Sequence, residues 1–203
     1  MRDLPTMSFL ILLTTVSVSL AGLYLSPKII ERCMLRPYWL KRQGEYERLI
    51  TSGFVHADLW HLAFNMLTFY FFAFALEDRI GSLKLLTLYL LGLVLSDVGT
   101  YFKHRDNPDY ASLGASGAIS AVLFAYIVYF PDRHLFLLFF PVPVPAPIFA
   151  IAYLAYTYYS ARHPTGRINH DAHLGGALTG LAFVAVTTPS AYGDLLRVID
   201  GWV

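Results

Sequence analysis

Charged residues are scarce in this chain. Only 14% of its 203 residues are Asp, Glu, Lys or Arg, while 56% are hydrophobic and the mean hydropathy is +0.52. An ordinary soluble domain carries about 25% charged residues. The shortage argues against a soluble globular protein and predicts a chain that is solvated by lipid.

Other absences narrow the function classes. One cysteine, Cys33, excludes an internal disulfide and leaves no thiolate cluster for a metal. No basic run is longer than Lys41-Arg42, so nucleic acid is not an expected partner. A membrane metalloprotease built on His170 and His173 would need a ligand set such as His-Glu-x-x-His, which the sequence lacks. No metal, nucleotide or other cofactor is expected.

What the chain does have is a series of apolar windows about as long as the roughly 18 residues that a spanning helix needs. We predict an all-α, polytopic membrane protein in which residues 1–203 form a single domain. The first window is longer than the apolar core of a cleaved signal peptide, and Arg2 beside it is balanced by Asp3, so we expect it to be a span. The six predicted spans are 7–25, 60–76, 83–103, 114–130, 135–160 and 172–188.

The long connector 26–58 has mixed charge and is predicted to lie along the membrane interface. Tyr38 and Trp39 are residue types that settle at headgroup depth. Arg48 is expected to hold the loop in shape through an ion pair with Glu45 or Glu47, although a solvated loop face would explain the same charges. Orientation is ambiguous, because a cytoplasmic N-terminus would leave most Lys and Arg residues outside, against the positive-inside rule.

Prolines interrupt the fifth window. Alternate residues of PVPVPAP lack a backbone N–H, which leaves carbonyl groups unpaired in lipid unless a neighbour or a cavity satisfies them. We expect this helix to be broken or sharply kinked near its middle, either as a simple kink or as a gate. The prolines are Pro141, Pro143, Pro145 and Pro147.

Polar residues open three of the apolar windows, although a charged residue in a span costs about 2.5 to 3.5 kcal/mol on insertion scales. Taken singly, each group has a structural explanation: a packing serine, a hydrogen bond between helices, or a small-residue packing face. The groups are His61 with Asn65, Ser116 within Gly114-Ala115-Ser116-Gly117, and His173 with Gly176 and Gly180.

Together the three groups supply the parts of an acyl-transfer site. Ser116 at a helix start lies beside free backbone N–H groups and the positive end of the helix dipole. His173 is a base that titrates near working pH, and His61 with Asn65 can donate to a developing oxyanion. Windows two, four and six run in the same direction, so all three groups are expected near one membrane face.

These motifs resemble those of the rhomboid family of intramembrane serine proteases. That family has His-x-x-x-Asn on its second helix, Gly-x-Ser-Gly on the fourth and Ala-His-x-x-Gly-x-x-x-Gly on the sixth. Here they read His61 to Asn65, Gly114 to Gly117 and Ala172 to Gly180, and the resemblance extends from about residue 45 onward.

The resemblance implies a catalytic dyad of Ser116 and His173 without a third acid. It also implies an oxyanion site made by His61, Asn65 and the backbone N–H of Ser116. The backbone N–H of Ala115 is a further candidate donor. Arg48 would belong to a structured first loop and His56 would support the site. The implied substrates are transmembrane segments of other proteins, in the lipid bilayer, and the implied topology has a cytoplasmic N-terminus with an outward-facing site.

Two positions depart from the family pattern. Many bacterial members have an aromatic residue four positions after the serine that stacks on the base, and here Ser120 stands there. The Trp-Arg pair of the first loop appears as Glu47-Arg48. Neither change removes a catalytic group, but the orientation of the His173 ring must come from another residue.

Two other classes compete with the protease. A catalytically inactive relative would bind transmembrane segments, and it would be expected to lack the serine or the histidine. A small transporter or channel would suit kinked helices, but the sequence shows no internal repeat. The expected location is a bacterial inner membrane, and the substrate, the cleavage site and the oligomeric state are left open.

Overall fold

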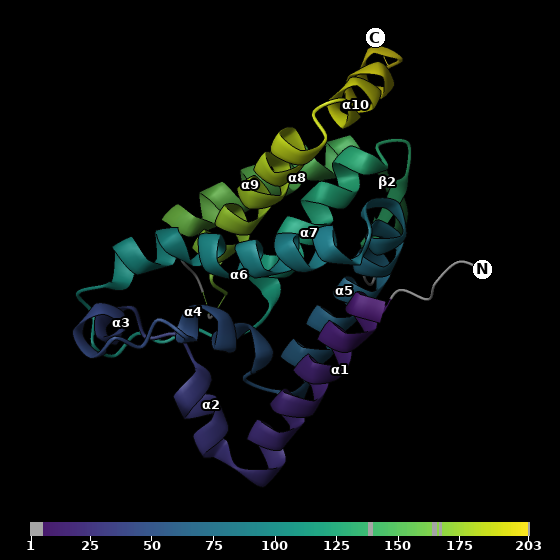
Figure 1. Ribbon diagram of the computed structural model, residues 1–203. Helices are drawn as coiled ribbons and strands as arrows, with labels where there is room; N and C mark the ends of the chain where they lie inside the picture. The colour runs from purple at the N-terminus through teal and green to yellow at the C-terminus, as the bar shows by residue number, and fades with distance from the viewer. Residues whose placement is uncertain (1–5, 138–139, 164–165, 167, 203) are drawn as a thin grey trace.

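A computed structural model describes residues 6–137, 140–163, 166 and 168–202, so that Arg2 and Asp3 lie outside the described part. The chain is helical with one β-hairpin (Figure 1). Its elements are α1 (Thr6–Leu20), the π-helical turn η1 (Ala21–Leu25), α2 (Pro27–Cys33), α3 (Pro37–Gln43), α4 (Arg48–Thr51), the 3-10 turn η2 (Ser52–Phe54), α5 (Leu59–Ile80), α6 (Ser82–His104), α7 (Ser116–Tyr129), β1 (His134–Leu137), β2 (Phe140–Pro145), α8 (Ala146–Arg162), α9 (His170–Thr187) and α10 (Ala191–Asp200).

Among the described residues, three helical segments are long and apolar enough to cross a membrane: α1 with its π-helical turn, α5 and α6. A fourth results if α9 and α10, which meet at a bend of 114°, are counted as one span. The predicted polytopic helical class is therefore confirmed, whereas the count of six spans is not. Helix α7 is apolar but has only 14 residues, too few to cross a hydrocarbon core of about 30 Å at 1.5 Å per residue.

Helix α7 is the centre of the bundle. It contacts α5, α6, α8, α9 and α10, and Figure 1 shows it enclosed by its neighbours. Every residue from Gly117 to Ala125 is buried, because the helix carries apolar or small side chains on all faces. Ser116, its first residue, is thus positioned by the most completely packed element of the fold.

The connector after α1 is folded into short helices rather than extended loop. Its α2, α3 and α4 lie together at the end of the bundle remote from α10 (Figure 1). The predicted ion pair of Arg48 is confirmed with Glu45, at 2.6 Å, and the same guanidinium donates to the carbonyl oxygens of Glu31 and Met34. Arg48 is nine-tenths buried, so it ties α2 to α4 from inside the connector.

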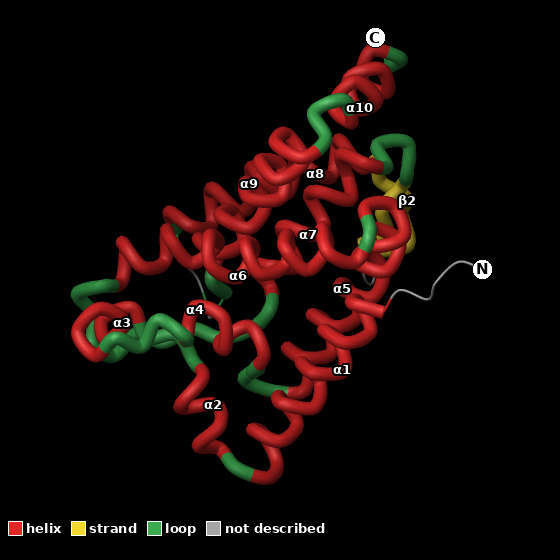
Figure 2. The backbone as a smooth tube through the Cα atoms, viewed as in Figure 1, coloured by secondary structure: helices red, strands yellow, loops and turns green. Residues whose placement is uncertain are grey.

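The prediction that the fifth span is helical in its first half is wrong. Strands β1 (His134–Leu137) and β2 (Phe140–Pro145) pair antiparallel, drawn in yellow in Figure 2, and helix α8 begins only at Ala146. Within the pair, His134 lies opposite Pro145. A residue before proline is driven towards extended backbone, so alternating prolines select a strand and not a kinked helix. Pro147 lies in the first turn of α8, where its missing N–H has no helical acceptor to lose.

Candidate active site

Ser116 follows a tight turn at the start of α7. Gly114, two residues before it, has φ +114°, a backbone conformation that favours glycine. A Cβ on Gly114 would lie 2.6 Å from Cε1 of His61, so the small residue is also needed for space. The N–H of Gly114 donates to the carbonyl oxygen of Ser52 at 2.9 Å, which fixes the turn to η2.

A buried chain of hydrogen bonds supports the same turn. The N–H of Ala115 donates to Nε2 of His56 at 3.4 Å, and Nδ1 of His56 lies 2.9 Å from the hydroxyl of Ser19 on α1. Because Nε2 accepts, the proton of the neutral ring is assigned to Nδ1, which then donates to Ser19. Burial, and secondly the adjacent His61, lower the pKa of His56 to about 3, so this ring stays neutral at ordinary pH.

This arrangement bears on the role suggested for Ala115. Its N–H donates to Nε2 of His56, so in this arrangement it is not free to donate to an oxyanion. The backbone N–H of Ser116, by contrast, heads α7, where helix geometry provides no intrahelical acceptor. His56 holds the backbone immediately before the serine, and its supporting role in catalysis stays a prediction.

His61 and Asn65 lie one helical turn apart at the start of α5. The helix begins after Asp58, whose carboxylate accepts the N–H of His61 at 2.8 Å as an N-cap. Asn65 is buried, and its Nδ2 has no hydrogen-bond partner among the described residues. A buried amide donor without an acceptor is costly to maintain, which marks Asn65 as a candidate donor to a bound ligand.

Helix α9 brings His173 close to α7 through its glycines. A Cβ on Gly176 would overlap the carbonyl oxygen of Gly117, and one on Gly180 would overlap that of Ala121. The helix starts at an N-cap that the sequence reasoning missed: the side-chain oxygen of Asn169 accepts the N–H of Ala172 at 3.1 Å. An asparagine three residues before the predicted window 172–188 was the signal that could have identified it.

Three helix starts line one cleft with a volume of about 740 Å³. Ser116 from α7, His173 from α9, and His61 with Asn65 from α5 all contribute to its wall. Among the described residues, no hydrogen bond joins the Ser116 hydroxyl to His173. Such bonds are often long or poorly aligned before substrate binds.

The rim of this cleft is polar. Nζ of Lys103 lies 2.7 Å from the carboxylate of Asp171 and donates to the carbonyl oxygen of Ala161, so it joins the ends of α6, α8 and α9. The Tyr110 ring stacks on His104 with centroids 3.5 Å apart. Burial raises the pKa of Tyr110 to about 12, which keeps its phenol neutral.

His170 also lines the cleft, with its ring 5.9 Å from that of His173. In the part of the chain that the structure describes, no third His, Cys, Asp or Glu gathers with them in a group that could hold a metal ion. The geometry therefore adds no ligand set to the metalloprotease alternative.

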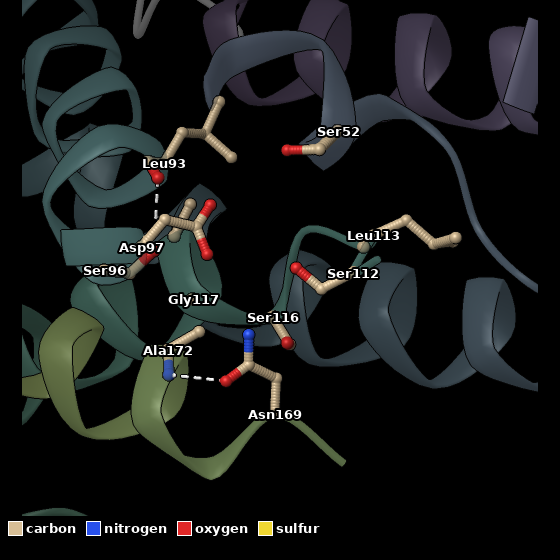
Figure 3. A pocket seen from close by; sticks show the side chains of 12 residues that line it. Ser52, Leu93, Ser96, Asp97, Ser112, Leu113, Ser116, Gly117, Asn169 and Ala172 are labelled. Atoms are coloured by element: carbon tan, nitrogen blue, oxygen red, sulfur yellow. Dashed lines mark hydrogen bonds between the residues drawn. The ribbon is translucent and has the colours of Figure 1, made fainter. Parts of the chain in front are cut away.

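A second, smaller cavity of about 20 Å³ lies behind Ser116, with room for a single water. Figure 3 shows the carboxylate of Asp97 turned into it, facing the side chains of Ser52, Ser112 and Asn169. Asp97 is nine-tenths buried and makes no hydrogen bond or ion pair with another described residue. Asp97 was not among the residues expected at the site, although a lone acid within an apolar window is a usable signal.

The chain matches the Rhomboid domain family over residues 43–190. It belongs to the rhomboid family. It is 33% identical over 151 residues to RHOMBOID-like protein 12, mitochondrial, of Arabidopsis thaliana, an alignment that covers 67% of this chain and 45% of that protein. It is 29% identical over 178 residues to Rhomboid protein 1, mitochondrial, of Saccharomyces cerevisiae, covering 83% and 50%.

The human Presenilin-associated rhomboid-like protein, mitochondrial, is 32% identical over 143 residues, covering 67% of this rhomboid and 36% of the human protein. The chain thus spans about half the length, or less, of these relatives. Its apolar helices and its family make it an integral membrane protein. All three relatives are named mitochondrial, so they lend no support to the expected bacterial inner membrane.

Proposed function

We propose that this rhomboid is an intramembrane serine endopeptidase that cleaves transmembrane segments of other proteins, with residues 1–203 acting as one membrane domain. Ser116 is the nucleophile and His173 the general base. The observation that carries the proposal is the shared cleft: three helices distant in sequence contribute Ser116, His173, His61 and Asn65 to one wall.

The chemistry follows from these groups. The Ser116 hydroxyl attacks the scissile carbonyl carbon while His173 takes its proton, and the same imidazolium then protonates the leaving amine. Water, deprotonated by His173, hydrolyses the resulting acyl-serine and regenerates the hydroxyl. No metal or organic cofactor enters either half of this reaction.

The oxyanion of each tetrahedral intermediate needs donors already in place. The Nδ2 of Asn65 is buried and unpaired, which gives it a free N–H in this cleft. The backbone N–H of Ser116 lies at the positive end of α7, and His61 lies against Gly114 beside it. A preorganised set of this kind stabilises negative charge more effectively than water does.

Substrate helices would be cleaved where their backbone is already unwound. A carbonyl within a regular helix is hydrogen-bonded and shielded, so the expected cleavage sites carry glycine or other helix-destabilising residues. The cleft is open to water and bounded by Lys103 and Asp171, which is compatible with hydrolysis near the end of a span.

The test is cleavage of a fluorogenic transmembrane peptide by purified protein in detergent, together with labelling by a fluorophosphonate. Ser116→Ala and His173→Ala should lower kcat by about 10³-fold or more and abolish labelling. Matched controls are Ser17→Ala, on the exposed side of α1, and His134→Gln, on β1, both of which should behave as wild type.

A folded wild type that neither labels nor cleaves several peptides would refute the protease. It would favour instead the catalytically inactive, segment-binding relative. Retention of cleavage in Ser116→Ala would refute the serine mechanism while leaving proteolysis in place.

A further inference from the structure

In the part of the chain that the structure describes, the imidazole of His173 makes no hydrogen bond. Among the described residues, its side chain makes ring contacts only, to Tyr153 and to His170. A catalytic histidine is normally held by a group that orients its ring, and no acid takes that role here. Packing must therefore set the direction of the ring.

Tyr153 of α8 supplies the larger of these contacts. Its ring stacks on that of His173 with centroids 6.4 Å apart and an angle of 25° between the planes, within the range of offset stacking. His170 meets the base edge-on, at 78°. Ser120 stands where many bacterial rhomboids have the aromatic residue that stacks on the base. Its hydroxyl is hydrogen-bonded to the phenol of Tyr153.

Hydrogen bonds fix Tyr153 to the nucleophile's own helix. The Ser120 hydroxyl donates to the carbonyl oxygen of Ser116 at 2.9 Å, which uses its single proton. The phenol of Tyr153, 2.8 Å from the Ser120 oxygen, must then be the donor in that pair. A continuous chain thus joins the ring that covers the base to the backbone of the nucleophile.

Two more rings restrict the tyrosine. Phe124 of α7 lies 5.4 Å from it between centroids, and Phe149, one turn earlier on α8, lies 5.9 Å from it. The outer face of α8 is exposed, as at Ile151 and Tyr159, whereas Tyr153 points inward. The docked position of α8 therefore determines where the stacking ring lies.

We propose that Tyr153 is a positioning residue, which aligns the His173 base by stacking and makes catalysis depend on the docking of α8. This inference rests on the proposed protease function. Loss of the ring should misalign proton transfer without removing contacts to the substrate, so it should act on kcat more than on KM.

The test compares Tyr153→Leu, which removes the ring, with Tyr153→Phe, which keeps the ring and loses only the hydroxyl. Tyr158→Leu is the matched control, since it removes an exposed aromatic of α8 that lies against the Arg162 guanidinium and is not one of the rings packed around Tyr153. We expect Tyr153→Leu to lower kcat and the rate of fluorophosphonate labelling about tenfold or more, with KM within about twofold. Tyr153→Phe and Tyr158→Leu should stay within about threefold of wild type.

A spectroscopic readout separates this inference from the protease proposal. In protein with labelled histidine, the imidazole protons of His173, assigned by their loss in His173→Gln, should carry a ring-current shift. That shift should disappear in Tyr153→Leu and persist in Tyr153→Phe, whether or not the protein cleaves anything. An unchanged shift in Tyr153→Leu would overturn the inference even in an inactive protein. In an active one, equal losses in Tyr153→Leu and Tyr158→Leu, or in Tyr153→Leu and Tyr153→Phe, would do the same.

Discussion

The N–H of Ala115 donates to Nε2 of His56, a residue 59 positions earlier in the chain. Through the other ring nitrogen the bond continues to Ser19, whose hydroxyl donates to the carbonyl oxygen of Phe54 at 3.0 Å. Helix α1 is thereby connected to the backbone that presents Ser116. His56 is fully buried. Protonation of its Nε2 would break the hydrogen bond from Ala115, and no water could reach the site to replace that bond.

Acid should consequently destabilise the protein through His56. Its pKa is lowered from 6.5 to about 3 in the folded state, so between these values the unfolded chain binds a proton that the folded chain does not. Stability contributed in this way is complete above pH 6.5 and falls by up to about 1.4 kcal/mol per pH unit as the pH drops towards 3. Thermal unfolding in detergent from pH 7.5 to 4.5 should show this slope.

His56→Gln is the comparison, because it removes the titrating group and keeps hydrogen-bonding atoms. The variant should be less stable at pH 7.5 and less sensitive to acid than wild type. Parallel pH slopes in the two proteins would assign the acid sensitivity to other groups.

The close packing of α9 on α7 at Gly176 should not tolerate even one added methyl group. Gly176→Ala would force a methyl group onto the carbonyl oxygen of Gly117, and such overpacking costs about 1 to 3 kcal/mol or more. Because this contact sets the approach of α9 to α7, labelling of Ser116 should fall together with the melting temperature. Gly193→Ala on α10, where a Cβ meets no atom within 4 Å, should leave both unchanged. If Gly176→Ala and Gly193→Ala had equal effects, the cause would be the replacement of a helical glycine in general and not the contact between α7 and α9.

Much of the site could be predicted because its signals are local. Polar residues at the starts of apolar windows were enough to predict that Ser116, His173 and Asn65 would lie near one another, and five of the six windows coincide with helices to within a few residues. Arg48 was also expected to pair with Glu45 or Glu47, and it pairs with Glu45. Capping, spacing and hydropathy are properties of short segments, so one sequence contains them.

The parts that could not be predicted depend on tertiary pairing. The segment 134–145 is as apolar as a span, and hydropathy alone does not separate a hairpin from a helix when prolines alternate through it. The stacking of Tyr153 on His173 is a contact between α8 and α9, and no pattern in the sequence predicts that these two rings meet. Nor does any local pattern show that the Ala115 N–H is taken by His56.

The buried guanidinium of Arg48 should be essential to the connector. Arg48→Ala would leave the Glu45 carboxylate unpaired, along with two carbonyl oxygens that the arginine now satisfies. Breaking one side of a buried ion pair costs about 3 to 5 kcal/mol. The melting temperature in detergent should fall clearly, and limited proteolysis should cut within residues 26–58. Arg42→Ala is the matched control, since its pair with Asp106 is exposed and exposed pairs contribute about 0 to 1 kcal/mol. A similar loss in both variants would contradict the role given to Arg48.

Asn65 offers the sharpest separation of function from stability. Its Nδ2 is buried without a partner, so replacing the side chain with leucine removes an unsatisfied donor from the folded state and should leave the melting temperature equal or higher. The same change removes one proposed oxyanion donor, which should lower kcat by about 10²- to 10³-fold. Peptide cleavage and thermal unfolding of Asn65→Leu, measured on one preparation, test both statements. A donor that is kept unpaired for a transition state raises kcat and lowers the stability of the folded protein. Loss of both activity and stability in Asn65→Leu would therefore mean that Asn65 has a structural role.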